Sequence, residues 1–113
     1  MKAVTKIVFL DGQGEKFFGE GPCRLLLGIE ETGSLRASAM QMGMAYTKAL
    51  KLMKNAEKAL GYKLTMRTSG GKDGGGSRLT PEGKEWLRRY EAYRDACVQA
   101  NRRIYLEFFP EQQ

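Results

Sequence analysis

Residues 45–60 carry two kinds of surface that a helix would separate cleanly. At helical spacing, apolar side chains collect on one arc and polar or basic side chains collect on the opposite arc. The apolar arc holds Ala45, Ala49, Leu52, Met53, Ala56, Ala59 and Leu60, and the other arc holds Thr47, Lys48, Lys51, Lys54, Asn55 and Lys58. Tyr46 and Leu50 lie at the boundary. We therefore predict a helix that packs through one face, exposes a positive face and ends at Gly61.

The positive charge of the chain is concentrated around this helix. Residues 34–80 contain nine basic and two acidic side chains, whereas the whole chain carries a net charge of +6, so the remainder is close to neutral. The basic residues are Arg36, Lys48, Lys51, Lys54, Lys58, Lys63, Arg67, Lys72 and Arg78. Charge confined to one segment predicts where an anionic polymer binds.

The residues before this helix predict a helix-turn-helix. Ser34 suits the N-cap of a short helix that runs to residue 42, and Gly43 lies in the turn that follows. An earlier helix is predicted from residue 22 to a stop at Gly33, so that helices fill residues 22–60. Apolar and β-branched residues on either side of a glycine-containing turn predict a β-hairpin over residues 2–18.

A second hairpin, or wing, is predicted over residues 62–80. Its strands cover residues 62–68 and 77–80, and a glycine-rich tip joins them. The tip does not match a nucleotide-binding P-loop, because Gly76 is followed by Ser77 and Arg78 rather than by the required lysine and hydroxyl residue. Thr80 and Pro81 then form the N-cap and first position of a long helix over residues 81–109.

This last helix carries an apolar seam close to heptad spacing. The seam contains Trp86, Tyr90, Tyr93, Cys97, Ala100, Ile104 and Phe108. Charges from residue 81 onward balance, with six basic and six acidic side chains, so the seam is better suited to protein than to DNA. We predict a dimer interface through Trp86, Tyr90, Tyr93, Cys97, Ile104 and Phe108. The alternative is that the seam packs onto its own domain.

Several functional classes are disfavoured by what the sequence lacks. There is no histidine, which removes the commonest general base, and the two cysteines are far apart with no metal-binding spacing. Met40, Met42 and Met44 are expected to fill gaps in the core. We expect no enzyme activity, no cofactor and no metal. No apolar run approaches ~20 residues and no signal pattern is present, so we expect a cytoplasmic, nucleoid-associated protein without a membrane partner.

The basic helix, the helix-turn-helix connection before it and the basic wing after it together favour binding of double-stranded DNA. A helix that presents threonine, lysine and asparagine fits a major groove, and flanking lysines neutralise phosphates. The candidate DNA-binding residues are Ser34, Arg36, Tyr46, Thr47, Lys48, Lys51, Lys54, Asn55, Lys58, Arg67, Lys72, Ser77 and Arg78. Two alternatives remain open: a basic architectural or RNA-binding protein, and an adaptor that holds a protein partner through the aromatic helix.

Three segments resemble the N-terminal domain of ModE-type molybdate-responsive transcriptional regulators. They are residues 33–35 (GSL), 42–49 (MGMAYTKA) and 67–83 (RTSGGKDGGGSRLTPEG), and the wing is more distantly similar to LysR-type regulators. The resemblance implies a mostly α, winged helix-turn-helix domain with a small β component over residues 1–113. It also implies a homodimer that dimerises through its terminal elements and regulates transcription from a palindromic operator.

The resemblance further assigns roles to single residues. It places base contacts on Tyr46, Thr47 and Lys48, and phosphate contacts on Lys51, Lys72, Ser77 and Arg78. Full-length members of the family continue into a molybdate-binding domain. Because this chain ends at Gln113, we expect a stand-alone relative that does not bind molybdate directly. The alternative is that the sequence is a piece of a longer regulator.

Overall fold

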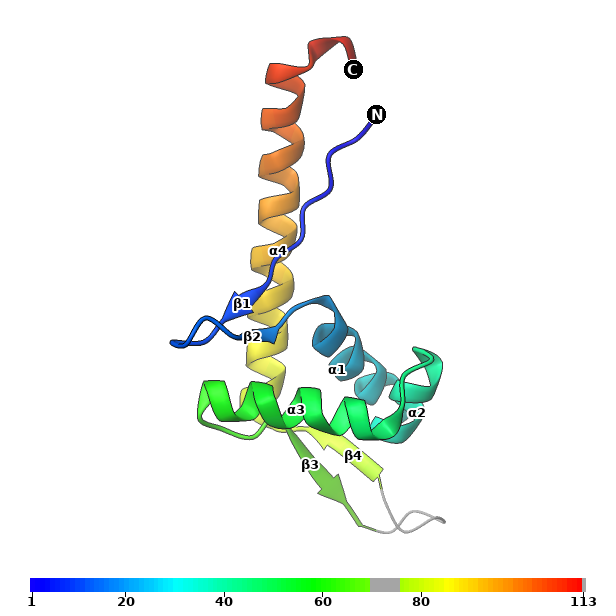
Figure 1. Cartoon of the computed structure of the whole chain (residues 1–113). Helices are drawn as coiled ribbons and strands as arrows, with labels where there is room; N and C mark the ends of the chain where they lie inside the picture. Colours follow the sequence, from blue (N-terminus) through cyan, green and yellow to red (C-terminus); the bar gives the residue numbers. More distant parts are fainter. Residues whose placement is uncertain (70–75, 113) are drawn as a thin grey trace.

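The computed structural model describes residues 1–69 and 76–112 as a mostly helical chain with two small antiparallel sheets. In chain order the elements are β1 (Phe9–Leu10), β2 (Lys16–Phe18), α1 (Glu20–Thr32), α2 (Leu35–Gln41), α3 (Tyr46–Leu60), β3 (Thr65–Thr68), β4 (Gly76–Leu79), α4 (Pro81–Phe108) and a 3-10 turn, η1 (Pro110–Gln112). The molecule is elongated, 57 × 30 × 24 Å, because the distal half of α4 projects beyond the other helices (Figure 1).

The helix boundaries follow the predicted caps. The side chain of Ser34 accepts a hydrogen bond from the backbone N–H of Ala37 at 3.0 Å, and the side chain of Thr80 accepts one from Gly83 at 2.8 Å. Gly33 and Gly61 end α1 and α3 in the left-handed conformation, with φ of 75° and 83°. These boundaries confirm the predicted helix-turn-helix and the start of the long helix.

The core lies where α1, α3 and the first turns of α4 meet. Its largest fully buried side chains include Phe18, Leu25, Leu26, Ile29, Leu64, Leu87 and Tyr90. Helix α3 contributes Ala49, Met53 and Ala56 to this core, as its apolar arc predicts. Small alanines there let the backbone of α3 approach the neighbouring elements closely.

Three predicted core positions are wrong. Ala45 is the N-cap of α3 with an extended backbone, so the helical arc does not include it, and Ala59 lies exposed in the last turn. Met40 is 73% exposed because the seven-residue α2 buries a narrower face, made of Leu35, Ser38 and Ala39. In each case the position lies outside the stretch that neighbouring elements cover.

The N-terminal hairpin is shorter than the sequence predicts. Only Phe9–Leu10 pairs with Lys16–Phe18, whereas residues 1–8 are extended and run beside α4 (Figure 1). Side chains of α4 hold this segment: Tyr90 Oη donates to the carbonyl of Ile7 at 2.9 Å, and Asn101 Nδ2 donates to Thr5 Oγ1 at 2.6 Å. Thr5 and Ile7 therefore contact a helix instead of extending the sheet, whereas Val4 and Val8 stay exposed.

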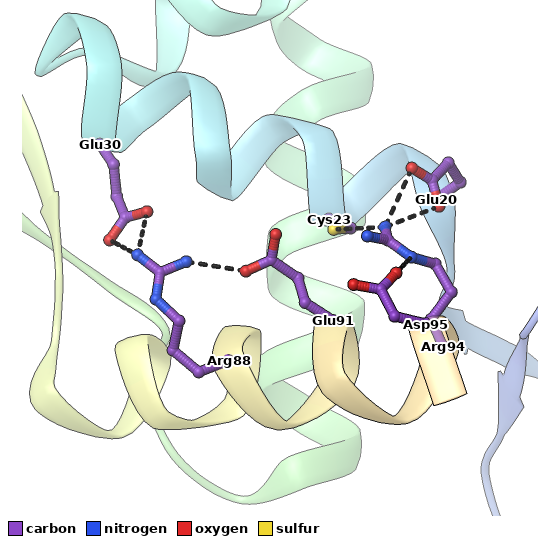
Figure 2. A network of polar contacts seen from close by, with 7 residues as sticks. All are labelled: Glu20, Cys23, Glu30, Arg88, Glu91, Arg94 and Asp95. Atoms are coloured by element: carbon purple, nitrogen blue, oxygen red, sulfur yellow. Dashed lines mark hydrogen bonds and ion pairs between the residues drawn. The ribbon is translucent and has the colours of Figure 1, made fainter. Parts of the chain in front are cut away.

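Polar contacts fasten α4 to α1 (Figure 2). Arg88 Nη2 donates to both carboxylate oxygens of Glu30, at 2.7 Å each, and Arg88 Nη1 donates to Glu91 Oε1 at 2.8 Å. Further along α4, Arg94 contacts Glu20 at 3.3 Å and lies beside the buried thiol of Cys23. These contacts join α4 to α1 beside the helical core.

Candidate nucleic-acid interface

Helix α3 presents an open basic face. Its exposed side chains are Thr47, Lys48, Lys51, Lys54, Asn55 and Lys58. Across residues 1–69 and 76–112, none of the four lysines of α3 forms an ion pair. The face is therefore solvated, uncompensated and available to an anionic partner.

The one acidic residue of α3 is engaged away from this face. Glu57 Oε2 accepts hydrogen bonds from the backbone N–H groups of Leu64 and Thr65, at 2.8 and 3.4 Å. Its other oxygen lies 3.7 Å from the ammonium of Lys63. Glu57 thus ties α3 to the start of the wing, and its negative charge does not offset the lysines on the exposed side.

The start of α3 is positioned by tight packing of α2 against α1. Ser38 Oγ donates to the carbonyl of Leu25 at 2.9 Å, and a Cβ on Gly28 would clash with the Ser38 side chain. The absence of a side chain at Gly28 therefore lets the two helices approach closely. The turn after α2 includes Gly43 with φ of 66°, and Tyr46 opens α3.

A recess of about 200 Å³ lies where α2, α3 and the wing converge. Ser34, Leu35, Arg36, Tyr46, Arg67, Gly76 and Ser77 line it. The guanidinium carbon of Arg36 lies 4.0 Å from the centroid of the Tyr46 ring, which is cation–π geometry. Among the residues with described positions, neither Arg36 nor Arg67 pairs with a carboxylate. The recess therefore offers two guanidinium groups to an anion.

Backbone contacts hold the wing beside this recess. The N–H of Ser77 donates to the carbonyl of Gly33 at 2.8 Å, which joins β4 to the turn between α1 and α2. At the base of the wing, the N–H of Thr80 donates to the carbonyl of Leu64 at 3.0 Å, which joins the two arms of the hairpin. Arg67 and Arg78 are exposed on its strands.

The structure brings most of the predicted DNA-binding residues to one side of the molecule. Those on α3 share its exposed surface, while Ser34, Arg36, Tyr46, Arg67 and Ser77 meet in the recess. The hydroxyl of Ser34 also serves as the N-cap of α2. Lys72 lies outside the described residues.

The predicted dimer seam divides into a buried half and an exposed half. Tyr90 is 2% exposed, and Trp86 and Tyr90 pack against Phe9 and Phe18, with ring centroids 4.9 to 5.9 Å apart. Tyr93, Ile104 and Phe108 are exposed at 52%, 47% and 74%, and Cys97 is half-buried. Tyr90 is therefore covered by its own chain, and the residues open to a partner are the later ones.

Sequence reasoning missed two features of this surface. The stacking of Arg36 on Tyr46 joins residues from different helices, and Lys16 of β2 lines a groove with Lys48 and Asn55 of α3. Neither pairing has a signal in residue spacing, because each depends on how separate elements pack.

The part of the chain that the structure describes contains neither a metal-binding cluster nor a membrane-spanning helix. Within the described ranges, no three His, Cys, Asp or Glu side chains gather as they would around a metal ion. Over the same ranges, no helix has both the length and the apolar character needed to cross a membrane.

Comparisons with known proteins agree with the geometry. Residues 23–84 match the family model described as bacterial regulatory helix-turn-helix protein, lysR family. The chain is 40% identical over 63 residues to the molybdenum transport protein ModE of Herbaspirillum seropedicae, covering 56% of this chain and 23% of that protein. It is 35% identical over 68 residues to the molybdenum-pterin-binding protein MopB of Rhodobacter capsulatus, covering 60% and 25%. This chain thus spans about a quarter of the length of these curated relatives.

One solved structure shares the fold. The crystal structure of the BenM DNA-binding domain in complex with benA site 1 DNA superposes with a TM-score of 0.53, at 22% identity, over 75% of this chain and 93% of that one. With four helices and the β3–β4 wing, the described part of the chain has the predicted winged helix-turn-helix architecture.

Proposed function

We propose that this chain, which belongs to the lysR family of bacterial regulatory helix-turn-helix proteins, is a DNA-binding regulator of the LysR and ModE kind that binds a palindromic operator as a homodimer. The observation that carries the proposal is the exposed face of α3, whose lysines form no ion pair within the described ranges. The recess with Arg36 and Arg67 lies on one side of this face, and the N-terminal hairpin lies on the other. Such a face suits the major groove of duplex DNA.

We assign the base contacts to the first turn of α3. In helix-turn-helix proteins the N-terminal residues of the second helix reach the base edges. Here those residues are Tyr46, Thr47 and Lys48, and the last two are exposed. A lysine can donate to guanine O6 and N7, and a threonine can contact either base edges or a thymine methyl group.

We assign the phosphate contacts to residues that flank this turn. Lys51, Lys54 and Lys58 follow at helical spacing, and Arg36, Arg67, Ser77 and Arg78 lie at the recess or on the wing. Asn55 and Ser34 complete the interface, and Lys72 would extend it. Because each neutralised phosphate releases counterions, affinity should fall steeply as salt concentration rises.

The homodimer is proposed to form along the distal half of α4. Exposed apolar side chains there include Val98, Ile104, Phe108 and Phe109, and Val4 and Val8 of the extended N-terminal segment are also exposed. A second copy of the chain would cover this surface, since isologous contacts through one long helix are common in dimers. Two copies of α3 would then read half-sites about 10–10.5 bp apart or a multiple of that spacing.

Selection from random duplexes tests the sequence-specific and symmetric parts of the proposal together. The expected result is an enriched motif with two inverted half-sites, together with a dimeric mass by sedimentation in solution. If the chain binds duplexes at low salt but the selected sequences show no preferred bases, a basic architectural or RNA-binding protein is favoured instead. A monomeric mass without DNA retention at low salt would favour a protein adaptor.

The names of the two curated relatives refer to molybdenum transport and to molybdenum-pterin binding. We propose that this chain supplies the DNA-binding part of such a response in the cytoplasm, at the nucleoid, without binding molybdate or another cofactor itself and without catalysis. Binding-site mapping in cells with and without molybdate tests this. In cells, occupancy of these sites should change with molybdate, whereas the affinity of the purified chain for the same sites should not. An affinity of the purified chain that depends on molybdate would contradict the proposal.

A further inference from the structure

The exposed face of helix α3 lies between two other elements, the wing on one side and the N-terminal hairpin on the other. At about 100° per residue, Tyr46 and Glu57 lie on one flank of the helix, and Lys48, Leu52 and Asn55 lie on a flank roughly 180° away. The first flank faces the wing: Tyr46 shares the recess with Arg67 and Ser77, and Glu57 bonds to the start of the wing. Thr47, Lys51, Lys54 and Lys58 lie between the two flanks.

The second flank faces the N-terminal hairpin. A groove of about 270 Å³ separates them, lined by Lys16, Phe17 and Phe18 of β2, by Gly21 and Pro22, and by Met44, Lys48, Leu52 and Asn55. In Figure 1 the β1–β2 hairpin and the β3–β4 wing lie on opposite sides of α3. The helix is therefore bracketed by two β-hairpins, of which only the wing belongs to the helix-turn-helix segment.

Lys16 is directed toward this groove by its place in β2. Alternate residues of a strand share a face, so Lys16 lies on the same side as Phe18, which is fully buried under the helices. The stem of Lys16 passes Gly19, where its Cε lies 3.6 Å from the position a Cβ would take. Lys16 itself is exposed, and within the described part of the chain it has no acidic partner.

The carboxylate of Asp11, at the start of the hairpin turn, is occupied within that turn. Asp11 Oδ1 accepts hydrogen bonds from the backbone N–H groups of Gln13 and Glu15, each at 2.9 Å. Its carboxylate is thereby directed to the turn between β1 and β2. Lys16 and Lys48 consequently place two positive charges on one groove.

We propose that the N-terminal hairpin acts as a second DNA-binding finger, in which Lys16 contacts a backbone phosphate on the side of α3 opposite the wing. This inference rests on the proposed binding of duplex DNA by α3. A helix about 10–12 Å wide fills a major groove about 12 Å wide, so a sugar–phosphate strand passes along each of its flanks. The wing and Arg67 meet one strand, and Lys16 with Lys48 meets the other.

The test compares Lys16→Ala with Lys6→Ala, because Lys6 is an exposed lysine of the same N-terminal segment that lies beyond the hairpin. Affinity is measured by fluorescence anisotropy from 50 to 200 mM salt, on the selected operator and on a scrambled duplex. Lys16→Ala should lower the slope of log K against log salt by about one. It should weaken binding to both duplexes by the same factor, whereas Lys6→Ala should match the wild type.

Three outcomes separate the inference from the proposed function. A slope for Lys16→Ala equal to that of the wild type, while Lys51→Ala lowers it, overturns the second finger and leaves the function standing. A lower slope for Lys16→Ala with no change for Lys6→Ala supports it. If the wild type shows no salt-dependent binding to either duplex, the proposed function fails, and the inference fails with it.

Discussion

The guanidinium of Arg36 lies over the ring of Tyr46, with Cζ 4.0 Å from the ring centroid. This contact joins the first turn of α2 to the first residue of α3. It holds a positive charge and an aromatic ring together at the mouth of the recess that also contains Arg67. The stacking therefore orients Tyr46, a proposed base-contacting residue, and positions the guanidinium of Arg36 for a phosphate contact.

Replacing Arg36 should separate these two roles. Arg36→Gln removes the charge and the cation–π contact, which contributes about 0.5–1 kcal/mol at an exposed site. We expect weaker binding to all duplexes and a salt slope lower by about one. Arg36→Lys should keep the slope but lose part of the preference for the operator. Arg24→Gln, an exposed position on α1 outside the recess, is the control, and an equal effect there would contradict the assignment.

Gly83 should be intolerant of any side chain. A Cβ at this position would clash with the carbonyl oxygen of Leu64 and lie 2.9 Å from its carbonyl carbon. We expect Gly83→Ala to lower the free energy of unfolding by about 1–3 kcal/mol through overpacking, measured by urea denaturation. Gly21→Ala is the matched control, because Gly21 lies in the first turn of α1 with open space around it. That variant should be neutral or more stable by up to about 1 kcal/mol.

The two thiols should react at different rates. Burial raises the pKa of Cys23 from 9.0 to about 11, with a further upward effect from the carboxylate of Glu20. Roughly one thousandth of Cys23 is then thiolate at pH 8, and its side chain is fully buried, whereas Cys97 is half-buried. Alkylation at pH 8 followed by mass spectrometry should label Cys97 first. Equal rates at the two positions would contradict this.

The same shift gives a pH dependence of stability. Because the folded pKa is raised, Cys23 stabilises the folded state fully below pH 9 and loses that contribution as pH rises through about 11. The difference in unfolding free energy between the wild type and Cys23→Ala should therefore be constant below pH 9 and shrink above it. A difference that stays constant up to pH 11 would argue against a raised pKa.

The Arg88 contacts should make a modest, salt-sensitive contribution. Arg88 joins α4 to Glu30 of α1 and to Glu91 of its own helix, but its side chain is 55% exposed. Exposed ion pairs contribute about 0.2–1 kcal/mol, so Arg88→Ala should lower stability by no more than about 1 kcal/mol. The loss should diminish in high salt. Arg89→Ala, the adjacent exposed arginine, should have a smaller effect that does not depend on salt.

Local signals in the sequence predicted most of the fold. The capping hydroxyls of Ser34 and Thr80 and the glycines at positions 33 and 61 act through neighbours in the chain, so the helix ends could be read directly. The N-terminal strand was predicted too long because β-branched residues that pack on α4 have the same pattern as residues paired in a sheet. The spacing of apolar residues alone does not show whether they pack on a helix or pair in a sheet.

The candidate interface was predicted in part for the same reason. The lysines of α3 lie on one arc of one helix, and periodicity placed them correctly on the exposed side. The stacking of Arg36 on Tyr46 and the approach of Lys16 to Lys48 depend on tertiary packing between separate elements. The seam of α4 was continuous in sequence but is divided in space, because Phe9 and Phe18 cover Tyr90.

The central claim is that the exposed face of α3 reads and neutralises duplex DNA. The most direct test measures the salt dependence of binding for the wild type, Lys51→Ala and Thr47→Ala on the selected operator and on a scrambled duplex. Lys51→Ala should weaken both complexes equally and lower the salt slope by about one. Thr47→Ala should leave the slope unchanged and reduce binding to the operator alone. Equal losses on both duplexes for both variants, or no loss for either, would contradict the account.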